Sequence, residues 1–519
     1  MSTSSISSSE AKMPARLRTL GHQRQKPKPE IRISLNGARD LDYPVYSSLD
    51  KIEGTVSVTA PQDIRFENVD IQFVGSSKAY VEKLTTTASL PGRSEAFHQF
   101  LKLTQPIEES MYPQPRVLEA GRTYKFPFLF VVPQQMLPRI CRHTVLHESV
   151  RDAHLQLPPS LGDKTTPLDD LAPDMAIINY SVMARVTRAK GEEKDKNTLA
   201  HVARKVRIVP STSEHPPVDI DGEDGDYTMR SSKKIKKGVF KGKLGTLTMS
   251  AAQPKSLRLP SPTSHSDIPV STMATVKLRF DPADPRAQPP RLTTLSAKIG
   301  VKTFFASTAR THYPNKKSTM YDLSQGVHGE SISLPSRCVA GVEWTYHSSP
   351  PSSSPSSDLE RRDSACSLSP PLAKLPTPSA NPTEAGFYTA QILVPISLPQ
   401  ASTKTFVPTF HTCLISRIYN LSLHLGVHSN LGPSLELKVP LQISSSGSAS
   451  AQAEQESRDQ EDLAAEEREV EGFFEPRRIG PMREELVGGS QIPGAGGLRD
   501  APPQYEVLPS GGLRVPAYA

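Results

Sequence analysis

The chain has 519 residues, which is too long for a single hydrophobic core and indicates two or three domains. Only 36% of the residues are hydrophobic, below the share of about 45–50% in compact globular proteins, so part of the chain is expected to be disordered. Proline is abundant, with 49 residues, which argues against long helices. The net charge of +7 is compatible with an acidic partner such as a phospholipid surface or a phosphorylated segment.

The cysteines and the hydropathy indicate a reducing compartment and no membrane span. The four cysteines are Cys141, Cys338, Cys366 and Cys413. They are far apart and form no CxxC motif, which is typical of reduced thiols in a cytosolic protein. The Ser-rich and then basic start of the chain has no apolar core for a signal peptide, and no run reaches about 18 apolar residues. A cytoplasmic protein is therefore expected.

The N-terminal half predicts one β-sandwich. Residues 1–29 form a disordered arm, and strand-like alternation begins at Glu30. Runs of period two occupy residues 31–35, 52–58, 69–73, 124–132, 180–186 and 206–208. Turn signals such as Pro91-Gly92 separate them. Many short strands with polar outer faces are typical of an antiparallel sandwich, here over residues 30–210.

The C-terminal half predicts a second sandwich over residues 241–445. Its alternating runs lie at residues 276–280, 297–301, 388–396, 421–427 and 435–443. A linker with a basic cluster, residues 211–240, precedes it. A Ser/Pro-rich insert at residues 347–383 interrupts it as a disordered loop. Residues 446–519 are a disordered tail, so the predicted fold class is all-β with two tandem sandwiches.

The tail carries the sequence Pro502-Pro503-Gln504-Tyr505. The two prolines fix φ near −65°, so this segment is close to a polyproline II helix before it binds anything. Such a ligand offers its prolines to an aromatic-lined groove, and Tyr505 fills a neighbouring pocket. The pattern resembles the PPxY ligand of WW domains, although Pro-Pro-x-Tyr also occurs by chance in proline-rich chains.

Several segments resemble arrestin-related proteins of the α-arrestin kind, as found in fungi. The most specific is GRTYKFPFLFVVP at residues 121–133, where Phe-Pro-Phe-x-Phe precedes a proline. The others lie at residues 46–58, 64–75, 180–186, 290–307 and 407–418. The resemblance covers about residues 31–444, and the order and spacing of these segments are more specific than any one of them.

The resemblance implies two arrestin-like sandwiches and an adaptor function. Such an adaptor binds a plasma-membrane transporter or receptor and recruits a WW-domain HECT-type ubiquitin ligase through PPxY, so that the cargo is ubiquitinated and internalised from the plasma membrane to endosomes. Conventional arrestins hold their inactive state with buried charged residues between the domains, and this sequence does not reveal such residues. Two alternatives remain: an arrestin-fold signalling scaffold of the ambient-pH-sensing type, and a retromer-like trafficking subunit.

The basic cluster allows several roles. Its lysines are Lys233, Lys234, Lys236, Lys237, Lys241 and Lys243. A run of charges is usually a solvated linker face. The lysines could also contact anionic lipid or phosphate, accept ubiquitin, or serve in nuclear import. Since only Phe240 is interleaved to stack bases, no nucleic-acid partner is expected.

The Ser/Pro-rich insert offers candidate phosphorylation sites. These are Ser349, Ser354, Ser364, Ser369 and Thr377. All but Ser364 precede a proline, which suits proline-directed kinases, and two arginines upstream of Ser364 suit a basophilic kinase.

No catalytic site is predicted, because the sequence lacks a phosphate-binding Gly-rich loop, HExxH and GxSxG. No cofactor is expected. The spacing Cys141-x-His143-x-x-x-His147, with His154 beyond, suggests metal ligation, since thiolate and imidazole suit zinc. The segment lies between Leu137-Pro138 and Leu157-Pro158, however, and an ordered loop without metal is the preferred interpretation.

Overall fold

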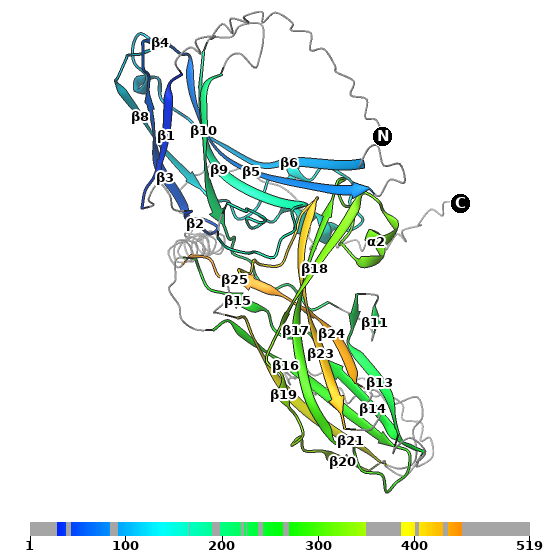
Figure 1. The fold of residues 1–519 in the computed structure, drawn as a ribbon. Helices are drawn as coiled ribbons and strands as arrows, with labels where there is room; N and C mark the ends of the chain where they lie inside the picture. The colour runs from blue at the N-terminus through cyan, green and yellow to red at the C-terminus, as the bar shows by residue number, and fades with distance from the viewer. Residues whose placement is uncertain are drawn as a thin grey trace, which may run out of the picture. The chain divides into compact units, whose positions relative to one another are not determined.

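The computed structural model describes residues 28–448, except 38–42, 84–91, 166, 189–197, 219–222, 225, 237–241, 263–268, 349–385, 400–403 and 429–433. Strands dominate these residues and form two sandwiches (Figure 1). The all-β fold predicted from the alternating runs is confirmed. Among the described helices, none is both long and apolar enough to cross a bilayer.

The first sandwich packs a three-stranded sheet against a five-stranded sheet. The smaller sheet has the order β1-β3-β8, with β1 (Glu30–Leu35), β3 (Lys51–Thr59) and β8 (Thr123–Val131). The larger has the order β2-β10-β9-β5-β6, with β2 (Val45–Tyr46), β10 (Thr198–Ile208), β9 (Ala176–Thr187), β5 (Asn68–Lys83) and β6 (Gly92–Gln105). Short strands β4 (Ile64–Arg65) and β7 (Val117–Leu118) pair separately. Neighbours pair antiparallel except β2 with β10.

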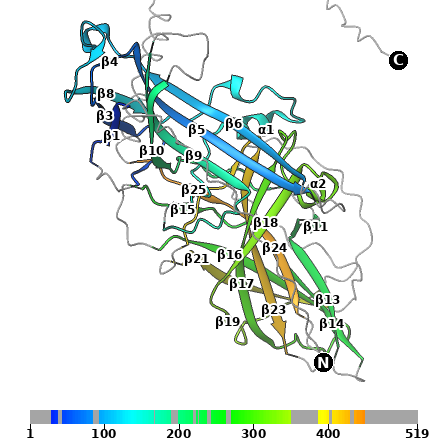
Figure 2. The same cartoon turned by 45° about the horizontal axis from the view of Figure 1, so that its top comes forward.

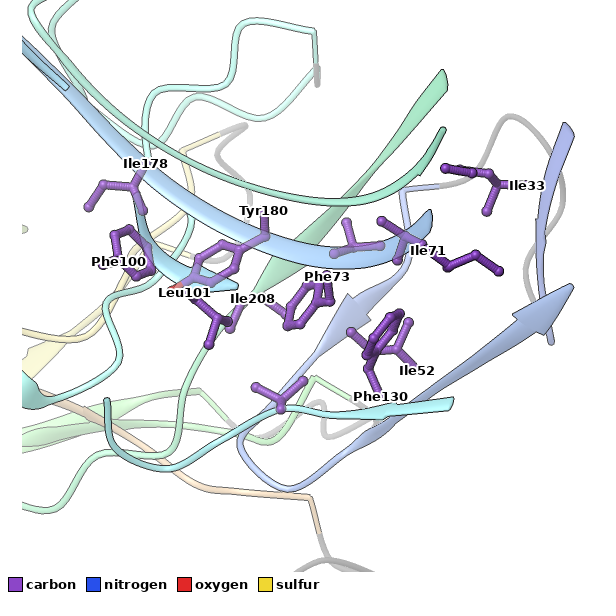
Figure 3. Close-up of a cluster of buried hydrophobic side chains, with 14 of the residues drawn as sticks. Ile33, Ile52, Ile71, Phe73, Phe100, Leu101, Phe130, Ile178, Tyr180 and Ile208 are labelled. Atoms are coloured by element: carbon purple, nitrogen blue, oxygen red, sulfur yellow. The ribbon is translucent and has the colours of Figure 1, made fainter. Parts of the chain in front are cut away.

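Side chains that alternate along the strands fill the space between these two sheets (Figure 3). Along β8, Phe126, Phe128 and Phe130 are buried while the residues between them are exposed. The rings of Phe73 on β5 and Tyr180 on β9 stack with centroids 6.0 Å apart. The period of two therefore puts the large apolar residues on one face of each sheet, as a two-layer core requires.

Pro127 lies within β8, although proline cannot donate to a β-ladder. β8 is an edge strand, and the Leu129 N–H donates to Oε1 of Gln105 at 3.0 Å, on the side away from β3. Because N–H groups alternate along a strand, the Pro127 nitrogen two residues earlier faces the same open edge. The Phe-Pro-Phe segment therefore loses no hydrogen bond to β3.

The second sandwich consists of a five-stranded sheet and an eight-stranded sheet. One has the order β13-β14-β16-β21-β20, with β13 (Arg230–Lys236), β14 (Lys243–Ala251), β16 (Ser271–Pro282), β21 (Phe387–Ser397) and β20 (Thr345–His347). The other has the order β11-β12-β24-β23-β17-β18, with β11 (Glu223–Asp224), β12 (Tyr227–Thr228), β24 (Leu435–Leu441), β23 (Ile415–Val427), β17 (Leu292–Ala306) and β18 (Gln325–Ser333). Strand β19 (Arg337–Cys338) joins β17, β22 (Phe410–His411) joins β23, and β15 (Leu257–Leu259) pairs with β25 (Ile443–Ser445).

Two segments differ from the sequence expectation. Residues 211–240, expected as a linker, contain β12 and β13, which pair with β24 and β14 of the second sandwich. β13 is an edge strand and its only fully buried side chain is Ile235, so its sequence shows no alternation. The segment expected as a loop after Cys141 contains a helix, α1 (Glu148–Leu155). A second short helix, α2 (Lys316–Tyr321), follows β17.

Candidate functional site

The two sandwiches meet where each contributes side chains to the core of the other. Leu171, in the loop before β9, is 1% exposed and belongs to the hydrophobic core of the second sandwich. In return, Phe410, Leu414 and Ile415 of the second sandwich belong to the core of the first. The end of β17 also contacts β5 and β9, as two views of the fold show (Figures 1 and 2). We call residues 158–175 together with residues 404–417 the junction.

Two cysteines and two histidines point toward one another at the edge of the junction, to which one of them, Cys413, belongs. The ligand atoms of Cys141, His143, His154 and Cys413 all lie within 4.8 Å of one another. The Cys141 Sγ lies 3.3 Å from His143 Nε2 and 3.6 Å from His154 Nδ1. The Cys413 Sγ lies 3.2 Å from His143 Nε2. We call these four residues the Cys/His cluster.

Different local elements position the members of the Cys/His cluster. Cys141 caps the 3-10 turn η2 (Pro138–Ile140), and its N–H donates to the Pro138 carbonyl oxygen at 3.3 Å. His154 lies in the last turn of α1. Cys413 lies in the turn between β22 and β23, where its carbonyl oxygen accepts a 2.9 Å hydrogen bond from the N–H of Arg310. Backbone contacts therefore hold both cysteines in place.

The Cys/His cluster differs by one residue from the group of possible metal ligands suggested by the sequence spacing. His147 lies outside the Cys/His cluster and caps the N-terminus of α1, where its Nδ1 accepts a 3.2 Å hydrogen bond from the Ser149 N–H. Its place in the cluster is taken by Cys413, which is 270 residues from His143 in sequence. No local pattern could reveal this partner, because the meeting of the two sandwiches brings it there.

Burial governs the protonation of the groups around the cluster. Burial lowers the pKa of His154 to about 4, with His143 and Arg310 adding to the shift, so its imidazole is neutral at physiological pH. Burial raises the pKa of the Cys413 thiol to about 12, and the neighbouring Cys141 adds to the shift. Burial also lowers the pKa of Arg310 to about 9. Its Nη1 donates to Ser416 Oγ, whereas Nε and Nη2 have no hydrogen-bond partner among the described residues.

A cavity of about 550 Å³ lies next to the cluster, between α1 and the second sandwich. Tyr313 and His411 form one wall, with their rings edge to face at 4.9 Å, and Tyr313 Oη donates to the Ser149 carbonyl oxygen at 2.9 Å. Burial lowers the pKa of His411 to about 3. A cavity of this size accommodates a small ligand or a peptide side chain.

A buried charged network lies within the second sandwich. Lys302 Nζ donates to Asp226 Oδ1 at 2.8 Å, and the Lys316 N–H donates to Oδ2 of the same carboxylate at 2.9 Å. Burial opposes ionisation of Asp226, but the hydrogen bonds from Lys302 and Lys316 outweigh it and lower the pKa of this carboxyl. Burial, followed by the neighbouring charge of Lys302, lowers the pKa of Lys438 to about 8.

Part of the predicted basic cluster lies on β13, the edge strand. Lys234 and Lys236 are exposed, and Lys233 is exposed but donates from Nζ to the Ser434 carbonyl oxygen at 2.6 Å. Lys243 begins β14, whereas Lys237 and Lys241 lie outside the described residues. Lysines on an edge strand also oppose pairing with other chains, so their position alone does not require a partner.

The remaining predicted sites lie outside the described residues. These are the tail motif Pro502, Pro503 and Tyr505, and the candidate phosphorylation sites Ser349, Ser354, Ser364, Ser369 and Thr377. They stay predictions from the sequence.

Two family models match the chain. Residues 35–209, which cover the first sandwich from the last residue of β1 to the end of β10, match the model of the arrestin (or S-antigen) N-terminal domain. Residues 353–446, which include β21, β23 and β24 of the second sandwich, match the model of the Bul1 C terminus. No curated protein sequence matches the chain.

Proposed function

We propose that this chain, which is an arrestin-related protein, acts as an adaptor that brings a WW-domain HECT-type ubiquitin ligase to membrane transporters or receptors. Ubiquitination of that cargo then promotes its endocytosis. Two sandwiches matched by arrestin-related family models support an adaptor in general. The chemistry of transfer would belong to the recruited ligase, so the proposal assigns no catalytic residue to this chain.

The observation that carries the ligase assignment is the sequence Pro502-Pro503-Gln504-Tyr505 on a chain with two arrestin-related sandwiches. Two consecutive prolines restrict the free peptide to conformations near the bound one, so little ordering entropy is lost when a WW domain binds. A single ligand of this size typically binds with a Kd of about 1 μM, which corresponds to about −8 kcal/mol.

The lysines of β13 supply a surface that could orient the adaptor at a membrane. Lys234 and Lys236 are exposed, and Lys233, also exposed, directly precedes them on the strand. Each lysine near an anionic lipid surface contributes about 1 kcal/mol, so a few lysines add to a cargo interaction without replacing it. The proposed location is accordingly the cytoplasm, with recruitment to the plasma membrane and endosomes.

A pull-down with isolated WW domains tests the ligase assignment. The full chain with Pro503→Ala and Tyr505→Ala should lose WW binding and keep its melting temperature, since both changes lie outside the two cores. Tyr518→Ala is the matched control, because it removes another tail tyrosine that is not preceded by two prolines. Equal WW binding by the wild type and the double variant would overturn the assignment.

Cargo identification separates the adaptor from its rivals. In cells that lack the protein, surface proteomics should show transporters or receptors that accumulate at the plasma membrane. Re-expression of the wild-type protein should lower the surface levels of these transporters or receptors again, and re-expression of the Pro503→Ala, Tyr505→Ala variant should not. If both versions restore surface levels, a scaffold or retromer-like function that does not need the tail motif is favoured.

A further inference from the structure

We propose that Cys141, His143, His154 and Cys413 bind one zinc ion as a structural Cys2His2 site that joins the two sandwiches. The assignment goes beyond the proposed adaptor function and does not depend on it. Three ligands come from the first sandwich, and Cys413 comes from the second.

The distances fit a tetrahedral ion. Zinc with Zn–S bonds of about 2.3 Å and Zn–N bonds of about 2.0–2.1 Å separates its sulfur and nitrogen ligands by about 3.5 Å. The three sulfur–nitrogen distances in the Cys/His cluster are 3.2, 3.3 and 3.6 Å. All four ligand atoms lie within 4.8 Å of one another, so they surround one common centre and need only small side-chain movements to close on an ion.

The donor set matches zinc chemistry. Two thiolates and two imidazoles form the closed four-ligand set of structural zinc sites, whereas calcium and magnesium prefer oxygen ligands. When zinc binds, the two thiol protons pass to solvent and the site becomes Zn²⁺ with two thiolates and two neutral imidazoles, which is electrically neutral. A neutral site suits a place where Cys141, His154 and Cys413 are buried.

A neighbouring carbonyl orients one of the imidazoles. Nδ1 of His143 lies 3.2 Å from the carbonyl oxygen of Thr144, and Nε2 of the same ring faces both sulfurs. If Nδ1 carries the proton and donates it to Thr144, the lone pair of Nε2 points into the cluster. An outer hydrogen bond of this kind typically orients zinc-bound histidines.

The position of the site defines what the metal would do. Cys413 lies in the turn between β22 and β23, and His143 is 270 residues away in the loop of the first sandwich that precedes α1. A metal bond between them closes a very long loop and opposes separation of the sandwiches at the junction.

Metal analysis of the full chain tests the proposal. Protein purified under reducing conditions without chelator, and dialysed against zinc followed by metal-free buffer, should retain about one zinc ion per chain. Cys413→Ser and His143→Asn should reduce the content to near zero. Cys338→Ser is the thiol control, because Cys338 is exposed and outside the cluster. His147→Asn is the histidine control, since asparagine keeps an N-cap on α1.

Two further measurements use only the wild-type protein, so they do not depend on whether the variants fold. X-ray absorption of the zinc-loaded protein should show two sulfur ligands at about 2.3 Å and two nitrogen ligands at about 2.0–2.1 Å. Cobalt titration should produce the visible bands of a tetrahedral thiolate site. A shell of oxygen and nitrogen only, no retained zinc, or a disulfide between Cys141 and Cys413 found by mass spectrometry under the same reducing conditions would overturn the proposal.

Discussion

The guanidinium of Arg417, on β23 of the second sandwich, donates from Nη1 to the backbone carbonyl oxygen of Asp170, in the loop before β9, at 2.9 Å. Its Nη2 donates to the carbonyl oxygen of Leu171 at 3.2 Å. Arg417 is fully buried, so both contacts are shielded from water. One arginine therefore satisfies two backbone groups of the other sandwich and holds the loop that inserts Leu171 into the second core.

Replacement of Arg417 should destabilise the junction. Arg417→Met leaves the buried carbonyl of Leu171 and the half-buried carbonyl of Asp170 without these donors, at a cost of about 1–3 kcal/mol for the buried group and less for the other in the free energy of unfolding. Arg417→Lys should recover only part of the loss, because an ammonium cannot reproduce the planar fork that reaches two carbonyls. Chemical denaturation measures the change, and Arg291→Met, an exposed site in the same sandwich, is the control. Equal stability of Arg417→Met and the wild type would show that the contacts contribute nothing net.

Leu171→Ala should loosen the same junction from the apolar side. Leu171 is 1% exposed and its φ is 59°, so the chain accepts a strained backbone in order to bury this side chain. Truncation should cost about 2–5 kcal/mol in the free energy of unfolding, as for other buried leucines. Leu168→Ala in the same loop is the control, since Leu168 is 43% exposed and should change stability little. Comparable effects of the two substitutions would contradict an anchoring function of Leu171.

The lowered pKa of Lys438 predicts a pH-dependent stability difference. Its folded pKa is about 8, below the value of about 10.4 for an unfolded lysine. Between about pH 8 and about pH 10.4 the Lys438 side chain binds more protons in the unfolded chain than in the folded one, so its contribution makes the free energy of unfolding rise with pH. Below about pH 8 the residue is charged in both states, and the full cost of burying its charge is present. Lys438→Met should therefore stabilise the protein at pH 7, and the gain should shrink toward pH 10.

Other groups titrate in the same range, so the measured quantity is the difference between Lys438→Met and the wild type at each pH. Lys298→Met is the control, because Lys298 is an exposed lysine of the same sheet. A stability difference between Lys438→Met and the wild type that stays constant from pH 7 to pH 10 would show that the pKa of Lys438 is not lowered by folding.

The edge-strand lysines should make vesicle binding sensitive to charge and salt. Lys234→Glu with Lys236→Glu should remove binding to anionic vesicles without unfolding the protein, because both side chains are exposed. Lys233 is left unchanged, since its contact with Ser434 joins β13 to the residue before β24. Wild-type binding should weaken as salt shortens the Debye length below about 8 Å.

The matched control is Lys102→Glu with Lys125→Glu, which makes the same charge change at exposed positions of the first sandwich. Loss of vesicle binding in both double variants would indicate a response to net charge alone. If Lys234→Glu with Lys236→Glu leaves vesicle binding unchanged, the lysines do not bind lipid, and the remaining explanation is that they oppose pairing of the β13 edge with other chains.

The alternating runs predicted most strands of both cores, but not β6 or β14, which also contribute buried residues. Period two along residues such as Phe126, Phe128 and Phe130 is a local property, because successive side chains of a strand point to opposite faces whatever the partner strand is. The edge strand β13 was not predicted, because it shows no apolar alternation: an edge strand tolerates polar side chains at positions where a central strand needs apolar ones. The short tail motif is likewise a local pattern and is readable only in the sequence.

Contacts between distant segments could be decided only by the tertiary structure. The sequence spacing grouped His147 with Cys141 and His143, but the fold uses His147 as a helix cap and brings Cys413 from the other sandwich. Arg417 and Leu171 also carry no local signal of their mutual contact. The physical reason is that these contacts join segments far apart in the sequence, and their geometry depends on how the two sandwiches pack together rather than on the residues beside them.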